Sequence, residues 1–471
     1  MRKRSLFLLL ISFLVSGCFK FGKDYQPPQL NIDIPGIYHH IPESSDDNFY
    51  REDHWWEVFR DTELNQLVDL VLKNNLDIQR AVSHVLEVRS QFRITRADRF
   101  PEFNLRTNGQ RQKQNYSNPI SGGRDSQTSD YYTLSLPAAF EWDLWGRLAR
   151  AEEAARAELL YARENRLVVS QTIIAEAIGR YFEIRSWALR VEILKKTITS
   201  YKQGLHLVER RYNHGMVSVL DVRQARRMLA RAEAQLPVMR KQLGLTQHKQ
   251  AILLGFYPNT SLPNNGMPEY YYDLAPVPQA LPAELLCRRP DIRAAEARLK
   301  ALHARVGVAF ASRFPRITLT GSLGYTSDEL GKLLDPKSEI WNLAIGIGQP
   351  LFEAGRLKAN QKIMEARYVG GLADYVICIL KAFSEVEDAL FIREQELFHR
   401  ERILALLEEA RATQKMAEVR YQSGLVGYLA VLDASQACFE AEEQLALVNL
   451  TIFLNRINLH RALGGGWGKA E

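Results

Sequence analysis

Two short stretches of the chain match each other at a separation of 209 residues. RYNHGMVSVLDV begins at Arg211, and RYQSGLVGYLAV begins at Arg420. The same offset relates two further pairs of segments, residues 146–148 with 355–357 and residues 254–255 with 463–464. This period is far longer than the repeat of a solenoid protein. The pattern therefore predicts a duplicated domain whose two halves pack side by side.

The two copies differ in length at one place. Upstream of it the offset is 214, because ADRFP at 97–101 matches ASRFP at 311–315. The first copy is therefore five residues longer than the second. The extra residues lie in the region where the first copy reads NYSNPISGGRDSQTSD, beginning at Asn115. This stretch is polar and rich in Gly and Ser, which is typical of a loop, and exposed loops tolerate such length changes. We expect a surface loop that differs between the copies.

After its Phe-Pro dipeptide, each copy alternates between apolar and small or polar residues. The apolar face holds Ile317, Leu319, Gly321, Leu323 and Tyr325, then Trp341, Leu343, Ile345 and Ile347, and in the first copy Tyr132, Leu134, Leu136, Ala138, Phe140 and Trp142. Alternation over about ten residues with aromatics near the ends is typical of a membrane β-strand. A soluble, half-buried hairpin is the alternative that the same pattern allows.

On the membrane interpretation, β-hairpins are expected over residues 102–145 and 315–354, which gives four strands per chain. Lipid does not accept open sheet edges, and a single-chain barrel needs at least eight strands. Four strands therefore cannot close alone. The barrel must be completed by other subunits, most simply in a symmetric ring.

A long segment without proline follows each predicted hairpin, at residues 146–212 and 355–421. A helix of this length would span roughly 100 Å. In the first copy, apolar positions from Ile174 to Tyr212 recur about every 3.5 residues, which is the spacing of a coiled coil. Shorter helices are expected to run back over 218–254 and 428–463. A helix of about 25 residues before each hairpin could supply the missing length by stacking end to end.

The N-terminus reads MRKRSLFLLLISFLVSGCFK, a basic start followed by an apolar run and small residues. This is the pattern of a signal peptide, and it is too short for a spanning helix. The ending LVSGC resembles a bacterial lipobox, which would make Cys18 the lipidated first residue of the mature chain. Phe19 stands where an Asp would indicate retention in the inner membrane, so the outer membrane is favoured. An ordinary signal peptide with a chance cysteine is the alternative.

These boundaries divide the chain into a signal peptide (1–17), a lipidated, extended N-terminal segment (18–62), a first repeat (63–256), a proline-rich connector (257–285), a second repeat (286–464) and a C-terminal tail (465–471).

The composition and the remaining motifs argue against nucleic-acid binding and catalysis. A formal net charge of +6 over 471 residues is a weak bias, and no basic patch with interleaved aromatics stands out. Cys287, Cys378 and Cys438 show no C-x-x-C spacing, so buried free thiols are expected rather than a metal site or a disulfide framework. GGGWG near the C-terminus lacks the Lys-Ser/Thr of a phosphate loop. We expect no catalytic residue, no cofactor and no bound metal.

Taken together, these features resemble the TolC family of outer-membrane efflux ducts. The resemblance rests on the lipobox, LDIQRA, the Phe-Pro before each hairpin, WDLWGR, LFEAGR, the two RYxxG turns, RRPDI and ALGGGW, in this order. It implies a mixed α/β membrane protein that is mainly α. Three chains with four strands each would form a 12-stranded outer-membrane β-barrel, continuous with a long periplasmic α-helical coiled-coil barrel.

The resemblance also implies the partners and the function. The homotrimer would be a passive conduit for drugs or other small molecules. A periplasmic membrane-fusion adaptor would join it to an inner-membrane efflux pump, and outer-membrane lipid would surround the barrel. A duct for type I protein secretion is the first alternative, and a structural coiled-coil lipoprotein of the envelope is the second. ALGGGW and the lipobox favour the pump branch.

In that family the RYxxG turns are the periplasmic tips of the helical hairpins, where the duct closes and the adaptor docks. The resemblance therefore implies a periplasmic gate made by Arg420, Tyr421, Asp433 and Asp221. The residues expected to contact the adaptor are Tyr212, Gly215, Val217, Ser218, Gly424, Val426 and Leu429. A second acidic position found in some members is Ala430 here, so an acidic ring would be thinner.

Simpler interpretations of the same tip residues stay open. Ser218 to Asp221 fits a helix capping box, which would explain Asp221 without a gate. Asp433 lies too far into its helix for capping and could be a solvated surface charge. Gly215 and Gly424 fit turn positions that require a positive φ.

Overall fold

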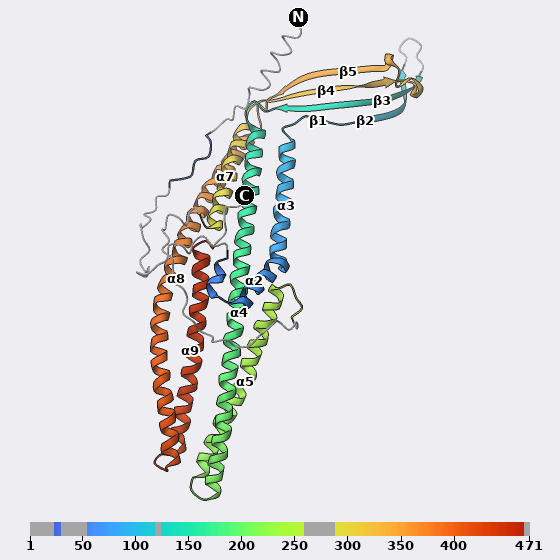
Figure 1. Ribbon diagram of the computed structural model, residues 1–471. Coiled ribbons are helices and arrows are strands. Elements are labelled where there is room, and N and C mark those ends of the chain that lie inside the picture. The colour runs from blue at the N-terminus through green and yellow to red at the C-terminus, as the bar shows by residue number, and fades with distance from the viewer. Residues whose placement is uncertain (1–22, 30–53, 118–123, 259–287, 466–471) are drawn as a thin grey trace. The chain divides into compact units, whose positions relative to one another are not determined.

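The structure is a computed structural model that describes residues 23–29, 54–117, 124–258 and 288–465 (Figure 1). Cys18, Cys287 and nearly all of the predicted connector lie outside these residues. Among the residues that it describes, no helix is both long enough and apolar enough to cross a membrane.

The helices follow the duplication closely. The short 3-10 helix η2 (Trp55–Phe59) lies before the first repeat, whose α-helices are α2 (Thr62–Asn74), α3 (Leu76–Ala97), α4 (Arg147–Asn213) and α5 (Val219–Leu253). In the second repeat they are α7 (Pro290–Ala311), α8 (Arg356–Gln422) and α9 (Tyr428–Ala462). Both long helices contain 67 residues, and both return helices contain 35. The long helix, the turn and the half-length return helix expected from the sequence are therefore present twice.

The chain divides into two compact units that do not coincide with the two repeats. One unit comprises residues 1–30, 84–163 and 294–376, and the other comprises 31–83, 164–293 and 377–471. Each unit draws on both repeats because α4 and α8 run through the boundary. Each long helix thus begins in the first unit and ends in the second.

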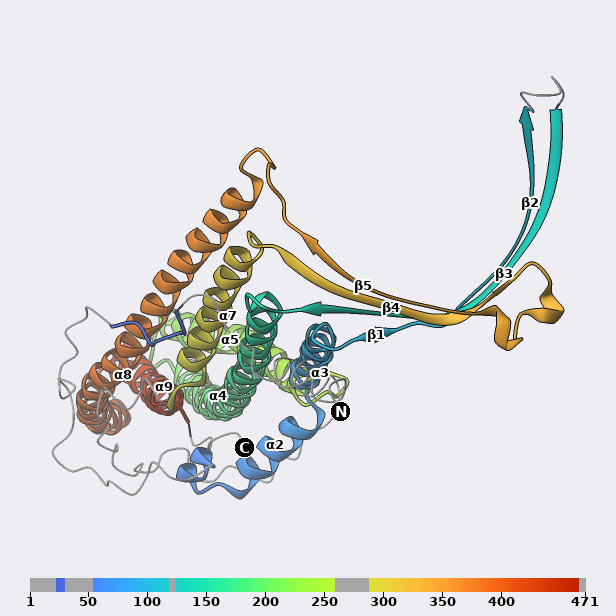
Figure 2. The ribbon, with the colours of Figure 1, turned by 90° about the horizontal axis from the view of Figure 1, so that it is seen from above.

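The first unit contains an antiparallel sheet of the strands β1 (Glu102–Phe103), β2 (Arg106–Ser117), β3 (Arg124–Trp142), β4 (Arg316–Ser327) and β5 (Glu339–Gly348). Its order is β2-β3-β4-β5, with β1 beside β3. The sheet curves strongly, and the β2–β3 hairpin extends past the end of β4 (Figure 2). This extension carries the polar, Gly- and Ser-rich stretch of the first copy, whose tip lies outside the described residues.

β1 and β2 are two parts of one strand. Both pair with β3 in a single continuous register. Between them, the Asn104 amide donates to the Pro137 carbonyl at 3.0 Å, but Pro137 has no N–H with which to complete the pair. The chain therefore contributes four strands, as expected from the sequence.

Two observations show that this sheet is incomplete by itself. β2 pairs only with β3 and β5 pairs only with β4, so each presents an open edge within the described chain. The apolar face of β5 is also uncovered: Trp341 is 75% exposed and Ile347 70%. An open edge beside a large apolar surface requires neighbouring strands and a lipid-like environment.

The second unit is helical and has two main apolar cores. One lies under η2, where Trp55, Trp56 and Phe59 pack against α4 and α9. This 3-10 helix corrects the expectation that residues 18–62 are extended, because four of its five residues bury their side chains. The second core lies near the hairpin tips and includes Val191, Leu194, Ile198, Tyr201 and Val208 from the predicted stripe of α4. Tyr212, at the end of that stripe, is 44% exposed.

Candidate functional site at the tips of the helical hairpins

The two hairpin turns have the same main-chain geometry. At the end of α4, Gly215 N donates to Tyr212 O at 2.8 Å and Met216 N donates to Arg211 O at 2.9 Å. At the end of α8, Gly424 N donates to Tyr421 O at 3.0 Å and Leu425 N to Arg420 O at 2.9 Å. This is the Schellman motif, and the positive φ of Gly215 (71°) and Gly424 (74°) is the conformation it requires.

The return helices begin differently. α5 has a complete capping box, in which the Ser218 hydroxyl accepts from Asp221 N and the Asp221 carboxylate accepts from Ser218 N at 3.0 Å. The N-cap residue of α9 is Gly427, which has no side chain to cap the helix, and Ala430 stands where the first copy has Asp221. The capping role expected for Asp221 is therefore present.

Arg211 joins the two tips within one chain. Its Nη1 donates to the Tyr421 carbonyl at 2.9 Å and its Nη2 to the Gln422 carbonyl at 3.0 Å. The guanidinium also lies 4.5 Å from the centre of the Tyr421 ring. The two carbonyls belong to the last turn of α8, where unsatisfied C=O groups and the negative end of the helix dipole favour a cation. Arg211 of the first hairpin thus caps the C-terminal end of α8 in the second hairpin.

Tyr421 is buried beneath this contact, with 3% of its surface exposed. Burial raises the pKa of its hydroxyl, the neighbouring Arg211 opposes that shift, and the Asp221 carboxylate adds to it. The Tyr428 ring lies 5.1 Å from the Tyr421 ring, and burial raises the pKa of Tyr428 to about 12. Both phenols are therefore neutral members of the apolar core at neutral pH.

The structure thus brings together only part of the gate expected from the sequence. Asp221 acts on Tyr421 through its negative charge, which adds to the rise in the pKa of that phenol. Arg420 and Asp433 are exposed, and the side chain of neither makes a hydrogen bond or an ion pair to the part of the chain that the structure describes. Arg420 borders a shallow depression of about 370 Å³ that is otherwise lined by Ala, Thr and Met side chains of α8 and α9 and by Val426 of the turn between them. Among the residues that the structure describes, neither the Arg420 nor the Asp433 side chain has a polar partner.

Most of the residues expected to contact the adaptor lie on the surface of the two turns. Tyr212, Gly215, Ser218, Gly424 and Leu429 are exposed, and Val217 and Val426 are partly buried against the tip core. Five of the seven residues are therefore open to solvent at the tips.

Arg211 is the tip residue that sequence reasoning did not single out. It begins the first RYxxG turn, but the family resemblance implies a role only for Arg420, its counterpart 209 residues later. The repeat itself carried the signal, since both copies begin with the same Arg-Tyr pair. The sequence does not show which of the two arginines donates to carbonyl groups of its own chain.

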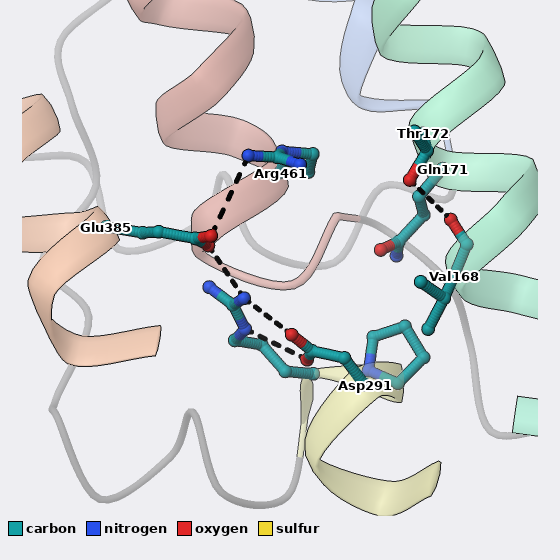
Figure 3. Close-up of a pocket in the computed structure, with 8 residues that line it drawn as sticks. Val168, Gln171, Thr172, Asp291, Glu385 and Arg461 are labelled. Carbon is teal, nitrogen blue, oxygen red and sulfur yellow. Dashed lines mark hydrogen bonds and ion pairs between the residues drawn. The ribbon is translucent and has the colours of Figure 1, made fainter. Parts of the chain in front are cut away.

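A second polar cluster lies farther along the same unit, where α7 begins (Figure 3). Arg289 is 6% exposed and donates two hydrogen bonds to Asp291, at 3.0 and 2.7 Å, and one to Glu385 at 2.7 Å. Its Nη1 also donates to the Ala462 carbonyl at 2.9 Å. Burial alone would lower the pKa of Arg289, but the two carboxylates outweigh it and raise the pKa.

The charges of this cluster hold helix ends together and leave no room for a sizeable ligand. The cavity beside it is only about 70 Å³, and Arg461 closes one side with its Nη2 3.9 Å from Glu385 Oε1. All four charges are engaged with one another or with a helix end. Across the described residues, no group of three or more His, Cys, Asp or Glu side chains is arranged to hold a metal ion.

Comparison with known proteins places the chain in a family. The model of the family described as "Outer membrane efflux protein" matches residues 67–252 and 281–465. The solvent efflux pump outer membrane protein SrpC of Pseudomonas putida is 35% identical over 415 residues, covering 88% of each chain. The probable outer membrane lipoprotein SilC of Salmonella typhimurium is 31% identical over 467 residues, covering 98% of each. The solved outer-membrane channel OprN superposes with a TM-score of 0.86 at 29% identity, over 95% of this chain and 99% of that one.

The open-edged four-stranded sheet, the paired helical hairpins and these matches define an outer-membrane channel of an efflux system. The chain belongs to the outer membrane efflux protein family. Three copies supply the 12 strands that close one barrel, which removes the open edges of β2 and β5. The family and its relatives are channels and not enzymes.

Proposed function

We propose that the chain is a lipid-anchored duct whose helical tips form a periplasmic gate and dock a membrane-fusion adaptor, which links the duct to an inner-membrane pump. The observation that carries the gate is the Arg211 contact, because it holds the ends of two long helices together at the tip. A contact of this kind can be made and broken without disturbing the rest of the fold. Passage would then depend on whether the tips are joined or apart.

The cargo in this proposal is a small molecule. SrpC is named for solvent efflux, and its name supports export of small organic compounds by this chain. Efflux is favoured over protein secretion because the curated relatives described above are an efflux-pump protein and an outer-membrane lipoprotein. A host lacking its own channel would regain solvent tolerance on expression of this chain if the proposal holds.

Asp433 supplies the charge at the proposed gate. It is exposed, it lies beyond the first turn of α9, and no described residue of the chain pairs with it. Three such carboxylates around a narrow mouth would favour cations. Lacking the second acidic position, at Ala430, the ring would have one carboxylate from each chain.

The test of the gate is planar-bilayer recording with purified trimers. Asp433→Ala is expected to lower the preference for cations over anions severalfold and to change the conductance. Gln224→Ala is the matched control, because Gln224 occupies the same position in the first copy. If Asp433→Ala conducts and selects like the parent protein, the gate assignment fails.

The adaptor is proposed to dock on the turns. A photo-crosslinking residue at Leu425, which is 68% exposed beside Gly424, should capture a periplasmic protein in cells. The same probe at Val369, 65% exposed on α8 but in the other unit, is the control. Equal capture at both positions would contradict tip docking.

Lipid anchoring is proposed at Cys18, on the lipobox and on the likeness to the lipoprotein SilC. Mass spectrometry of the mature N-terminus should show a diacylated cysteine. An unmodified mature N-terminus would remove the anchor while leaving the channel assignment intact.

A further inference from the structure

The two copies have kept the same strand register in their hairpins. Moving each residue of a β2–β3 pair forward by its copy offset, 214 for β2 and 209 for β3, gives a pair of the β4–β5 hairpin. Arg106 with Ser135, for example, becomes Thr320 with Ala344, and the structure contains both pairs. The duplication therefore carries strand pairing from one copy to the other.

The same rule, applied to β3 and β4, gives the register of the seam between neighbouring chains. These two strands join the copies within one chain, and their counterparts at the seam are β5 and the β2 strand of the neighbouring chain. The pair Ala139 with Thr320 becomes Gly348 with Arg106 of the neighbouring chain. The seam is antiparallel, like the pairing from which it derives.

The apolar face of the sheet provides an independent check of this register. It sets Ile347 of β5 opposite Thr107, which pairs with Leu134 on the same apolar face. A shift by one residue would set Ile347 opposite Arg106 or Asn108 and would turn the apolar face of one strand toward the lumen. The register from the duplication thus keeps the lipid-facing and the lumen-facing sides separate.

This register brings two arginines to either side of one glycine. Gly348 pairs with Arg316 of its own chain, and the seam adds Arg106 of the neighbouring chain on its other side. All three positions alternate with the apolar ones, so they face the lumen. The Cα atoms of the two arginines are two strand spacings apart, about 10 Å. No atom of the described chain lies within 4 Å of a Cβ added at Gly348, so the space between them is open.

Neither arginine has an acidic partner among the described residues of its own chain. The side chains of Arg106 and Arg316 are exposed and make no hydrogen bond or ion pair to them. Glu141, beside Thr318 on the lumen-facing side, already receives two hydrogen bonds from Arg147, at 3.0 and 2.7 Å. Two like charges that face one open space favour an ion of opposite charge between them.

We propose that each seam forms a binding site for an oxyanion, the phosphate or carboxylate group of a solute in the lumen. Arg316 of one chain and Arg106 of the next donate to the same anion above Gly348, because guanidinium groups bind such oxygens through paired hydrogen bonds. Three seams place six arginines around the barrel, and rings of arginine favour anions in pores. The site needs only the trimer and is independent of the gate at the helical tips.

The corresponding place within one chain lacks this chemistry. There Glu102, Ala139 and Thr320 lie side by side on three strands, at the positions that hold Arg, Gly and Arg across the seam. The site therefore belongs to the three seams and is absent where the two copies meet inside a chain. Thr320→Ala is the matched control, because Thr320 occupies the place of Arg106 in the second copy.

Disulfide crosslinking of the full-length trimer tests the register. Asn342→Cys and Gln112→Cys face each other across the seam, so oxidation should give covalent dimers and trimers on a denaturing gel. The matched pair Thr133→Cys with Thr326→Cys should crosslink within the monomer. Asn342→Cys with Asn108→Cys is four residues out of register and should stay monomeric. Each single variant controls for the native cysteines. If the first pair stays monomeric while the in-chain pair crosslinks, the register and the site are wrong.

Single-channel recording tests the anion. At constant ionic strength, inorganic tripolyphosphate should reduce the conductance of the parent trimer in proportion to its occupancy of the site. Arg106→Gln and Arg316→Gln should each raise the half-blocking concentration about tenfold. Gly348→Glu should raise it similarly by placing a carboxylate between the arginines, whereas Gly348→Ala and Thr320→Ala should leave it unchanged. Equal block of the parent and of both arginine variants would place the anion elsewhere and end the proposal.

Ion selectivity separates this site from the proposed gate, because the two carry opposite charges. The double variant Arg106→Gln with Arg316→Gln should raise the preference for cations severalfold, whereas Asp433→Ala should lower it. A double variant that selects like the parent protein would overturn the barrel site and leave the gate standing. A channel that responds to the two arginines and not to Asp433→Ala would support the barrel site and overturn the gate.

Discussion

The two repeats make the same long-range contact with chemically different side chains. Asn75, before α3, donates from Nδ2 to the Leu253 carbonyl at the end of α5 at 2.8 Å. Arg289, before α7, donates to the Ala462 carbonyl at the end of α9 at 2.9 Å. These residues occupy matching places in the two copies. The duplication has kept the helix junction and has let its side chains diverge.

The difference changes what each junction depends on. The Asn75 side-chain oxygen Oδ1 caps α3 by accepting from Asp77 N and Ile78 N, so the first junction is a neutral amide bridge. Arg289 instead joins Asp291 and Glu385 in an ionic cluster around its buried guanidinium. A neutral bridge fails by losing hydrogen bonds, whereas an ionic cluster fails by leaving charges without partners.

Replacement of the two bridging residues should therefore have unequal effects. Arg289→Ala should destabilise the protein by about 2–4 kcal/mol, because it removes a buried guanidinium and leaves the partly exposed carboxylates of Asp291 and Glu385 without the cation that they share. Asn75→Ala should cost about 1–3 kcal/mol for the lost cap and bridge. Thermal unfolding of both variants, purified in detergent, measures the difference. Equal losses would show that the charges of the second junction are as well solvated as an exposed pair.

The tips offer a second contrast between the copies. Gly204 of α4 faces the Tyr428 hydroxyl at the start of α9, and a Cβ at Gly204 would overlap that oxygen. The matching positions in the other copy are Thr413 and Val219, and Val219 is 55% exposed. A glycine therefore faces a tyrosine where α4 meets α9, but the matching pair in the other copy has neither residue. This contact makes the two hairpins different.

Gly204→Ala should destabilise the tip by about 1–3 kcal/mol, because the buried Tyr428 side chain must move. Tyr428→Phe should rescue it, since without the hydroxyl the nearest ring carbon is 3.3 Å from the new Cβ. A double-mutant cycle on thermal unfolding measures the coupling. Additive effects would mean that the tyrosine is not what excludes the methyl group.

The repeat explains why so much of the fold could be predicted from the sequence. Positions such as Gly146 and Gly215 recur with their neighbours at a constant offset, so helix ends and turns were readable twice. The apolar period of α4 then placed Leu194 and Ile198 in the core. The alternation of apolar and polar residues predicted four strands. Because four strands cannot close a barrel, the outer strands β2 and β5 have open edges.

The parts that the sequence did not predict depend on contacts between distant residues. The buried side of η2 depends on rings such as Phe182 and Phe453, which belong to other helices. Likewise, Arg211 and Arg420 have nearly the same local sequence, and only the packing of the two hairpins decides which of them reaches the carbonyls inside the chain.

A buried histidine also distinguishes the second repeat. His460 of α9 is 6% exposed and stacks on Trp55 with 5.2 Å between ring centres, whereas the first copy has Ala251 there. Burial, and then the positive charge of Arg456, hold the pKa of His460 well below its usual value. In the unfolded chain, His460 therefore takes up a proton as the pH falls through about 6.5, whereas in the folded chain it stays neutral at that pH.

The sign of this linkage makes the fold less stable in acid. Below about pH 6.5, each pH unit should remove about 1.4 kcal/mol per chain until the folded-state pKa is reached. His460→Gln should remove that part of the pH dependence, which unfolding midpoints between pH 7.5 and 5.5 would show. The same slope in both proteins would mean that His460 is protonated in the folded state.

The smallest effect is expected from copying the first tip onto the second. Gly427 has φ −72° and ψ 161°, close to the −85° and 159° of Ser218, so a serine fits this backbone without strain. No atom lies within 4 Å of a Cβ added at Gly427, and Ala430 is exposed. Gly427→Ser with Ala430→Asp should therefore build the missing capping box and stabilise α9 by about 0.5–1 kcal/mol.

The reverse change, Ser218→Ala, should cost the first tip about 1 kcal/mol. If the second tip gains what the first tip loses, the copies differ at their helix starts only in the cap. If the transplanted box stabilises α9 but also alters conductance, the new carboxylate at position 430 reaches the mouth of the duct. Thermal unfolding and planar-bilayer recording of the same samples separate these two results, because capping energy changes the first and charge at the mouth changes the second.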